Sequence, residues 1–132
     1  MLPKIQLLSL KNQKAFDCSA KKSVKFTSRL FVLLATTISN LAVPELLSNK
    51  KIHQDKFLAY ISFKVSKKYG KANKRNLLKR RIRHIVQLYM QENYSPISLI
   101  FIPRFALKTI EYKILKSELT LAISWCKKKL VL

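Results

Sequence analysis

The segment from Lys64 to Arg83 concentrates ten Lys or Arg in twenty residues and contains no Asp or Glu. Mutual repulsion among so many like charges destabilises a compact chain, and a polyanion is the usual compensation. Apolar residues recur inside the run at regular spacing, which indicates a folded surface rather than a loose tail. We therefore expect this segment to place one side in a core and to leave its charges outside.

The hydrophobic period is helical from Ala72 to Glu92. Apolar residues at helical spacing form a single stripe, which comprises Leu78, Ile82, Ile85, Val86 and Tyr89. Polar and basic residues occupy the opposite side, namely Asn76, Lys79, Arg80, Arg83 and Gln87. This pattern predicts an amphipathic helix over 72–92 that packs through its apolar stripe and exposes a basic face.

The residues just before this helix alternate with the period of a strand. Over 56–66, one side carries Phe57, Ala59, Ile61, Phe63 and Val65, and the other carries Leu58, Tyr60, Ser62, Lys64 and Ser66. This alternation predicts a half-buried strand with a polar, partly basic outer face. Gly70 is the one glycine of the chain and lies between the two patterns, where we expect a tight strand-to-helix turn.

The remaining patterns complete a single domain over 1–132. In chain order, the predicted elements are a short helix over 8–19, a strand over 23–38, a loop over 40–55, the strand over 56–66, the basic helix, a strand over 97–104 and a helix over 108–129. One face of the last helix carries Leu115, Leu119, Ala122 and Cys126. The order α-β-β-α-β-α predicts an α+β sandwich with helices packed on a small sheet.

Composition favours a folded protein that binds nucleic acid. The chain has 132 residues, 48% of them hydrophobic, and a net charge of +21, so it combines a modest core with strong attraction for polyanions. An anionic membrane surface is the second partner class for such a charge. No spanning helix is expected, because polar residues and Pro44 interrupt the most apolar window, 30–47. The N-terminus lacks a secretory signal pattern, which favours a cytoplasmic protein.

Cysteine, histidine and the acidic residues give no sign of a catalytic or metal centre. Cys18 and Cys126 lack paired-cysteine spacing and are predicted to be reduced thiols. The six acidic residues are scattered, and neither His53 nor His84 sits in a pattern typical of a general base or a metal ligand. We expect both histidines on the surface.

The first turns of the basic helix carry Lys71, Lys74, Arg75, Lys79 and Arg80. A helix N-terminus already bears about half a positive charge, so these cations raise the energy of the free protein. Backbone N–H groups and guanidinium groups converge there on any phosphate that arrives. Because the run has no interspersed acid to pair with, we interpret it as a phosphate-binding surface rather than a solvated charged face.

The same residues resemble a family signature. The run Val65-Ser66-Lys67-Lys68-Tyr69-Gly70-Lys71-Ala72, followed by Arg75-Asn76-x-x-Lys79-Arg80-x-x-Arg83, is similar without a gap to the signature of the bacterial ribonuclease P protein subunit. The flanks are compatible with that family, with Phe16 near the end of a first helix and an apolar strand that ends in Arg104. The resemblance covers roughly residues 9 to 128.

The resemblance implies an assembly in which an RNA subunit cuts the 5′ leader from precursor tRNA with bound Mg²⁺, while the protein itself holds no cofactor. The protein would dock on the catalytic RNA through its basic region and hold the single-stranded leader in a cleft between the sheet and the first helix. The implied RNA-binding residues are Lys67, Lys68, Lys71, Lys74, Arg75, Asn76, Lys79, Arg80 and Arg83. The implied cleft residues are Phe16, Tyr60, Ser62, Lys64 and Arg104. A stacking aromatic beside a basic strand face suits a single strand of any sequence, and no protein partner is implied.

The chain departs from the family pattern at several positions. Leu77 stands where the family usually has a third Arg, Tyr60-Ile61-Ser62 stands where Arg-Leu-Gly is common, and Ala20 and Leu34 replace aromatic residues. These changes alter the expected shape of the aromatic cleft. Leu77 projects away from the face that carries Asn76, Lys79 and Arg83, so the identity of the basic helix is unaffected.

Other functions stay open at this point. A ribosomal or other structural RNA-binding protein is the second hypothesis, because composition alone does not separate it from the first. A major-groove DNA-binding helix fits less well, since a strand follows the basic helix and no short helix-turn precedes it. A membrane-surface helix is disfavoured because the apolar stripe is needed for the core.

Overall fold

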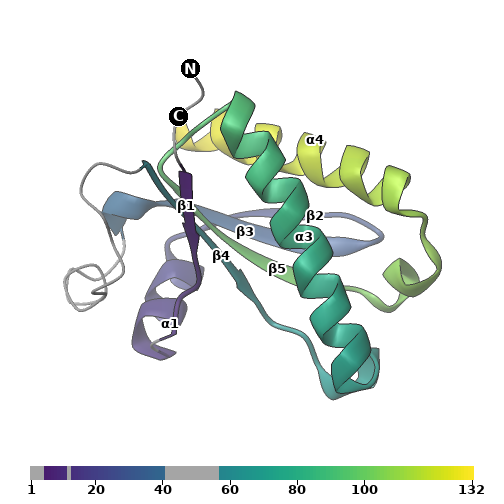
Figure 1. Ribbon diagram of the computed structural model, residues 1–132. Helices are drawn as coiled ribbons and strands as arrows, with labels where there is room; N and C mark the ends of the chain where they lie inside the picture. Colours follow the sequence, from purple (N-terminus) through teal and green to yellow (C-terminus); the bar gives the residue numbers. More distant parts are fainter. Residues whose placement is uncertain (1–4, 12, 41–56) are drawn as a thin grey trace.

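The computed structural model describes residues 5–11, 13–40 and 57–132, which form a mixed α+β fold (Figure 1). The strands are β1 (Ile5–Leu8), β2 (Val24–Thr27), β3 (Phe31–Thr37), β4 (Phe57–Phe63) and β5 (Ile97–Pro103). The helices are α1 (Gln13–Lys21), α3 (Ala72–Glu92) and α4 (Tyr112–Leu130). Three short 3₁₀ helices are η1 (Ile38–Asn40), η2 (Lys67–Tyr69) and η3 (Phe105–Thr109).

The strands form one five-stranded sheet in the order β1-β4-β5-β3-β2. β1, β4 and β5 run parallel, whereas β3 is antiparallel to β5 and β2 is antiparallel to β3. Parallel neighbours need a long crossover connection, and α3 supplies it between β4 and β5. The basic helix is therefore tied at both ends to the middle of the sheet.

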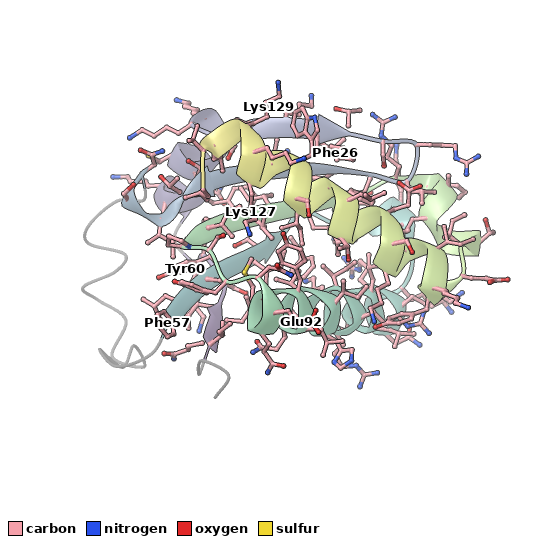
Figure 2. All side chains as sticks on the ribbon, turned by 90° about the horizontal axis from the view of Figure 1, so that it is seen from above. Phe26, Phe57, Tyr60, Glu92, Lys127 and Lys129 are labelled. Carbon is pink, nitrogen blue, oxygen red and sulfur yellow. The ribbon has the colours of Figure 1, made fainter. Side chains whose placement is uncertain are left out.

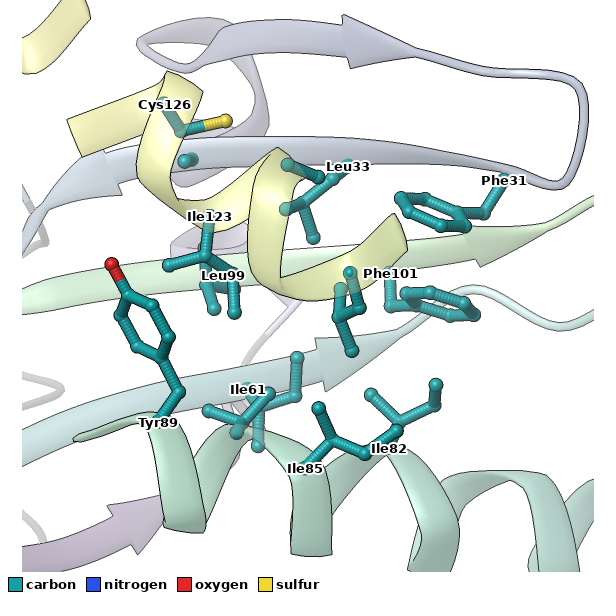
Figure 3. Packing of buried hydrophobic residues seen from close by; sticks show 14 of the residues in the cluster. Phe31, Leu33, Ile61, Ile82, Ile85, Tyr89, Leu99, Phe101, Ile123 and Cys126 are labelled. Carbon is teal, nitrogen blue, oxygen red and sulfur yellow. The ribbon is translucent and has the colours of Figure 1, made fainter. Parts of the chain in front are cut away.

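One face of the sheet is covered by α3 and α4, and the main hydrophobic core lies between these layers (Figures 1 and 3). In the close view, Ile85 of α3, Leu99 of the sheet and Ile123 of α4 point toward one another. Phe31 and Phe101 pack beside them with ring centroids 5.0 Å apart. Full burial of an apolar side chain stabilises a fold by roughly 1.5–3 kcal/mol, so the burial of Ile85 in this cluster helps to hold the charged helix on the sheet.

α1 packs on the other face of the sheet. Leu10, Ala15 and Tyr60 form a second buried cluster there, and the hydroxyl oxygens of Ser19 and Ser98 lie 3.5 Å apart. This second layer encloses the end of the face where Tyr60 pairs with Ser98 in the register of β4 and β5.

A lysine of α4 donates a hydrogen bond at the C-terminal end of α3. Figure 2 labels this residue, Lys127. Its Nζ donates to the carbonyl of Asn93, 3.3 Å away, and lies 5.3 Å from the centre of the Tyr89 ring. A cation at this end of a helix interacts favourably with the helix dipole. The preceding residue, Cys126, is buried, and burial raises the pKa of its thiol to about 11.

The α+β class is confirmed, and the basic helix spans the predicted residues. Two features of the N-terminal third differ from expectation. The chain forms β1 before its first helix, and α1 begins at Gln13 rather than residue 8. The strand predicted over 23–38 is a hairpin, because the amide of Ser28 bonds to the carbonyl of Phe31 and the Ser28 hydroxyl accepts from the Leu30 amide.

The turn before α3 lies where expected but has a different form. Gly70 has extended backbone, with φ of 160°, and is not in the left-handed region. The reversal is made by η2, in which the Gly70 amide bonds to the carbonyl of Lys67 at 3.3 Å. Nearly all of the predicted loop over 40–55, including His53, falls outside the described residues. No helix within the described ranges is long and apolar enough to cross a bilayer.

A matched pair of leucines in α4 tests this packing. Leu119 is fully buried, whereas Leu121 is 66% exposed. We expect Leu119→Ala to lower the free energy of unfolding by about 2–5 kcal/mol through the cavity it leaves. Leu121→Ala changes helix propensity by the same amount, and its free energy of unfolding should stay within about 0.5 kcal/mol of that of the parent. Denaturant unfolding measures both, and equal losses would contradict the assignment of the core face.

Candidate nucleic-acid interface

The predicted RNA-binding residues lie together at the N-terminal half of α3 and in the turn before it. Lys67 and Lys68 are exposed in η2, and Lys71 is the exposed residue that precedes the helix. On α3 itself, Lys74, Asn76, Arg80 and Arg83 are exposed, whereas Arg75 and Lys79 are half-buried. All nine predicted residues thus lie in η2, at the residue before α3 or on α3 itself.

The side of α3 that carries Lys79 and Arg83 runs along the edge of the sheet. Arg83 Nη2 donates to the hydroxyl of Ser9 at 3.2 Å, and its guanidinium carbon lies 5.3 Å from the centre of the Phe63 ring. One turn on, Gln87 Nε2 donates to the carbonyl of Ile5 at 3.5 Å. The contacts of Arg83 with Ser9 and Phe63 orient its side chain, so its remaining donors are positioned before any phosphate arrives.

A hollow lies beside this flank, between α1 and the end of β4. Its volume is about 360 Å³, and it is lined by Leu10, Lys11, Gln13, Phe16, Asp17, Phe63 and Lys64. The structure therefore brings together two of the predicted cleft residues, the half-buried ring of Phe16 and the exposed ammonium of Lys64. The Gln13 side-chain amide donates to the Asp17 carboxylate at 2.9 Å. Stacking surface and positive charge around one hollow suit a single-stranded nucleic acid.

Tyr60 and Ser62 lie deeper than the sequence pattern predicted. Both were expected on an open polar face, but they are 1% and 3% exposed. The reason is tertiary: the segment between β1 and α1 crosses this part of β4. The amide of Leu10 donates to Ser62 Oγ at 2.9 Å, and Ser9 Oγ donates to the carbonyl of Ile61 at 2.9 Å. Ser62 thus anchors the chain that leads into α1.

Arg104 lies apart from the hollow. Its side chain is exposed just beyond β5, and its amide bonds to the carbonyl of Leu30 at 2.9 Å. Between Arg104 and α1, the register pairs Val32 with Ile102 on the α1 side of the sheet, and both are half-exposed. These two residues, like Lys11 and Gln13, were not predicted from the sequence. Alternation along 31–37 and 97–103 was the signal available for the first pair.

The site has the electrostatics of a polyanion surface. The N-terminus of α3 and its cations attract phosphate from the same direction. Among the described residues, no group of three or more His, Cys, Asp or Glu is placed to hold a metal ion. The arrangement can bind, neutralise and orient a nucleic acid.

Comparison with known proteins bears on the same residues. The family model described as Ribonuclease P matches residues 6–127. The chain is 34% identical over 119 residues to the ribonuclease P protein component of Rickettsia bellii, with 89% of this chain and 92% of that protein covered. It is 33% identical over 120 residues to the corresponding component of Rickettsia canadensis, with 88% and 94% covered.

Solved structures agree on the fold. A ribonuclease P protein mutant of Staphylococcus aureus with defective mRNA degradation activity aligns with a TM-score of 0.64 at 25% identity, covering 88% of this chain and 86% of that one. The ribonuclease P protein of Thermotoga maritima aligns with a TM-score of 0.60 at 21% identity, covering 93% and 96%. The second likeness concerns the fold alone.

The anchoring role of Ser62 is open to a direct test. Ser62→Ala leaves the buried Leu10 amide without its acceptor, and we expect the free energy of unfolding to fall by about 1–3 kcal/mol. Ser66→Ala is the matched control, because Ser66 is exposed and its side chain forms no cap bond to η2; it should cost less than about 0.5 kcal/mol. Unchanged stability of Ser62→Ala in urea unfolding would contradict the anchor.

Proposed function

The chain belongs to the ribonuclease P protein family and is a component of a tRNA-processing endoribonuclease, and on this premise we propose how it contributes. It docks on the catalytic RNA through the basic surface of α3. It holds the 5′ leader of precursor tRNA in the hollow between α1 and β4. One observation gives the strongest support for two adjacent RNA contacts. Arg83 lies over the Phe63 ring, and Phe63 lines the same hollow as Phe16 and Lys64.

In this proposal the RNA subunit performs the hydrolysis. Mg²⁺ held by that RNA supplies the Lewis-acid chemistry of phosphodiester cleavage. The protein contributes charge and position. Lys79, Arg80 and Arg83 lower the repulsion between RNA strands that must approach one another, and the hollow fixes the strand next to the scissile bond. We propose the cytoplasm as the place of action.

The leader would be held without regard to its sequence. A base stacked on Phe16 gains about 1–3 kcal/mol, and every base offers a π-face. Lys64 on the rim is exposed and can meet a phosphate, and the half-exposed, paired residues Val32 and Ile102 lie on the same α1 side of the sheet. These contacts favour an unpaired strand over a duplex.

Reconstitution tests the docking surface. The full chain should raise cleavage of precursor tRNA by a bacterial ribonuclease P RNA at low Mg²⁺, because its cations replace part of the ionic screening. A triple variant, Lys79→Ala, Arg80→Ala and Arg83→Ala, should lose this effect. Its binding to the RNA should show a salt slope smaller by roughly 2–3, at about 0.9 or less for each lost phosphate contact.

A second triple variant is the control for net charge. Lys113, Lys116 and Lys128 of α4 are exposed and lie on another element, so their replacement by Ala removes the same charge from another surface. It should keep most of the stimulation and of the salt slope. If both triple variants lost stimulation and salt slope equally, the effect of the α3 residues would be explained by net charge alone and not by a contact at α3. Intact RNA binding without any stimulation by the parent chain would favour the ribosomal-type alternative.

Phe16 offers the test of the hollow. Phe16→Ala should weaken binding of leader-bearing precursor tRNA by about 1–3 kcal/mol and leave mature tRNA unaffected, because only the leader has a base to stack there. Phe16→Tyr keeps the ring and should restore affinity. Phe57→Ala, a half-exposed ring at the other end of β4, is the control. Equal weakening for precursor and mature tRNA would remove Phe16 from the leader site.

A further inference from the structure

α3 has a second basic side, which faces away from the hollow beside α1. Lys74, Leu77 and Arg81 follow one another at i, i+3 and i+7 and turn toward the region where η3 leads into α4. There they border a pocket of about 230 Å³ between η2, α3, η3 and the start of α4. We call it the tyrosine pocket and define it by Tyr69, Lys74, Leu77, Arg81, Lys108 and Tyr112.

The lining of the tyrosine pocket is divided by chemistry. Its floor is apolar and rigid, because it consists of buried leucines from three elements, Leu78, Leu107 and Leu115. Its walls include the half-buried ring of Tyr69 and the 38% exposed ring of Tyr112. Its rim carries three cations, and among the described residues that line it there is no Asp or Glu.

Contacts within the pocket hold these groups in place. The ammonium of Lys108 lies 5.6 Å from the centre of the Tyr69 ring and 4.5 Å from that of Phe105. Burial raises the pKa of the Tyr69 hydroxyl, and the nearby charge of Arg81 opposes that rise. The hydroxyl therefore remains protonated at neutral pH, with the charge of Arg81 nearby. Aromatic surface and cations that already face one another need little reorganisation to receive a ligand.

We propose that the tyrosine pocket binds one unstacked nucleotide of an RNA strand. The base lies on the apolar floor against a tyrosine ring, and its phosphate is held by the rim cations. Pockets for drug-sized ligands occupy about 300–1,000 Å³, so a hollow of about 230 Å³ suits a single planar base rather than a larger group. An acid-free rim next to aromatic rings favours a nucleotide over an apolar peptide.

The proposal rests on the proposed function in one respect, which is that the complex brings RNA to α3. It adds a second contact on the opposite flank of the same helix. The nucleotide must come from a loop or bulge, because bases inside a duplex are stacked and paired. The strand can belong to the catalytic RNA or to precursor tRNA, and both present the same chemistry.

Substitution of Tyr112 gives the main test. The full chain is titrated with a bacterial ribonuclease P RNA in one arm and with precursor tRNA in the other. Tyr112→Ala should weaken one of these complexes by about 5- to 100-fold, as expected for a lost base–aromatic stack, whereas Tyr112→Phe should restore affinity. Trp125→Ala is the control, because Trp125 is equally exposed at the other end of α4.

A charge variant keeps the test independent of packing. Arg81→Gln leaves the leucine floor intact and should lower the salt slope of the affected complex by about 0.9 or less, as for one phosphate contact. Ultraviolet cross-linking of the parent complex should place an RNA adduct on Tyr69 or Tyr112. Unchanged affinity and an unchanged salt slope in both arms would overturn the proposal. It would also be overturned if a short poly-glutamate peptide competed with RNA for the pocket and the RNA adducts lay only on other residues.

These experiments distinguish a failure of the pocket proposal from a failure of the proposed function. Failure of the proposed function appears as weak binding of ribonuclease P RNA by the parent chain and by the α3 triple variant alike. Failure of the pocket alone appears as parental binding in Tyr112→Ala and Arg81→Gln, while the α3 triple variant is still impaired.

Discussion

The packing of α3 on the sheet is the contact on which the rest of the structure depends. The helix carries repelling cations along its exposed sides and has no acid until Glu92. Its cohesion comes from the opposite stripe, in which Ile82, Ile85 and Val86 are fully buried against β-strands and α4. Apolar burial of this size offsets the repulsion and also fixes how the helix is rotated about its axis. The charge is thus presented in a fixed orientation.

That rotation divides the basic residues between two flanks. The flank with Lys79 and Arg83 lies against β1 and the end of β4, whereas the flank with Lys74 and Arg81 lies against η3 and the start of α4. Each flank meets aromatic rings, Phe63 on one side and Tyr69 on the other. A loose basic tail would offer the same charge without these surfaces, so the fold converts electrostatic attraction into two contacts with distinct geometry.

The sequence predicted those elements whose formation depends on a local hydrophobic pattern. The helical period over 72–92 and the alternation over 56–66 gave the basic helix and the strand before it, and the motif from Lys67 to Arg83 identified the family. β1 was missed because four residues carry little periodic signal and their partner in β4 lies 52 residues away. The burial of Tyr60 and Ser62 was missed for the same reason, since the covering chain arrives through that parallel pairing. Hydrophobic period reports which face can be buried, and only tertiary contacts decide how much of a polar face is also covered.

The missed strand explains the position of the hollow between α1 and β4. Because β1 and the segment into α1 close the Tyr60 end of the sheet, the open part is shifted toward the end of β4, where Phe16 and Lys64 meet. Phe63 lies at this boundary, since it lines the hollow and also supports the guanidinium of Arg83. In the proposed complex, a strand in the hollow and an RNA on α3 would therefore share one aromatic side chain. A shift of Arg83 on docking would act on the wall of the hollow, which would give the two contacts a direct physical connection.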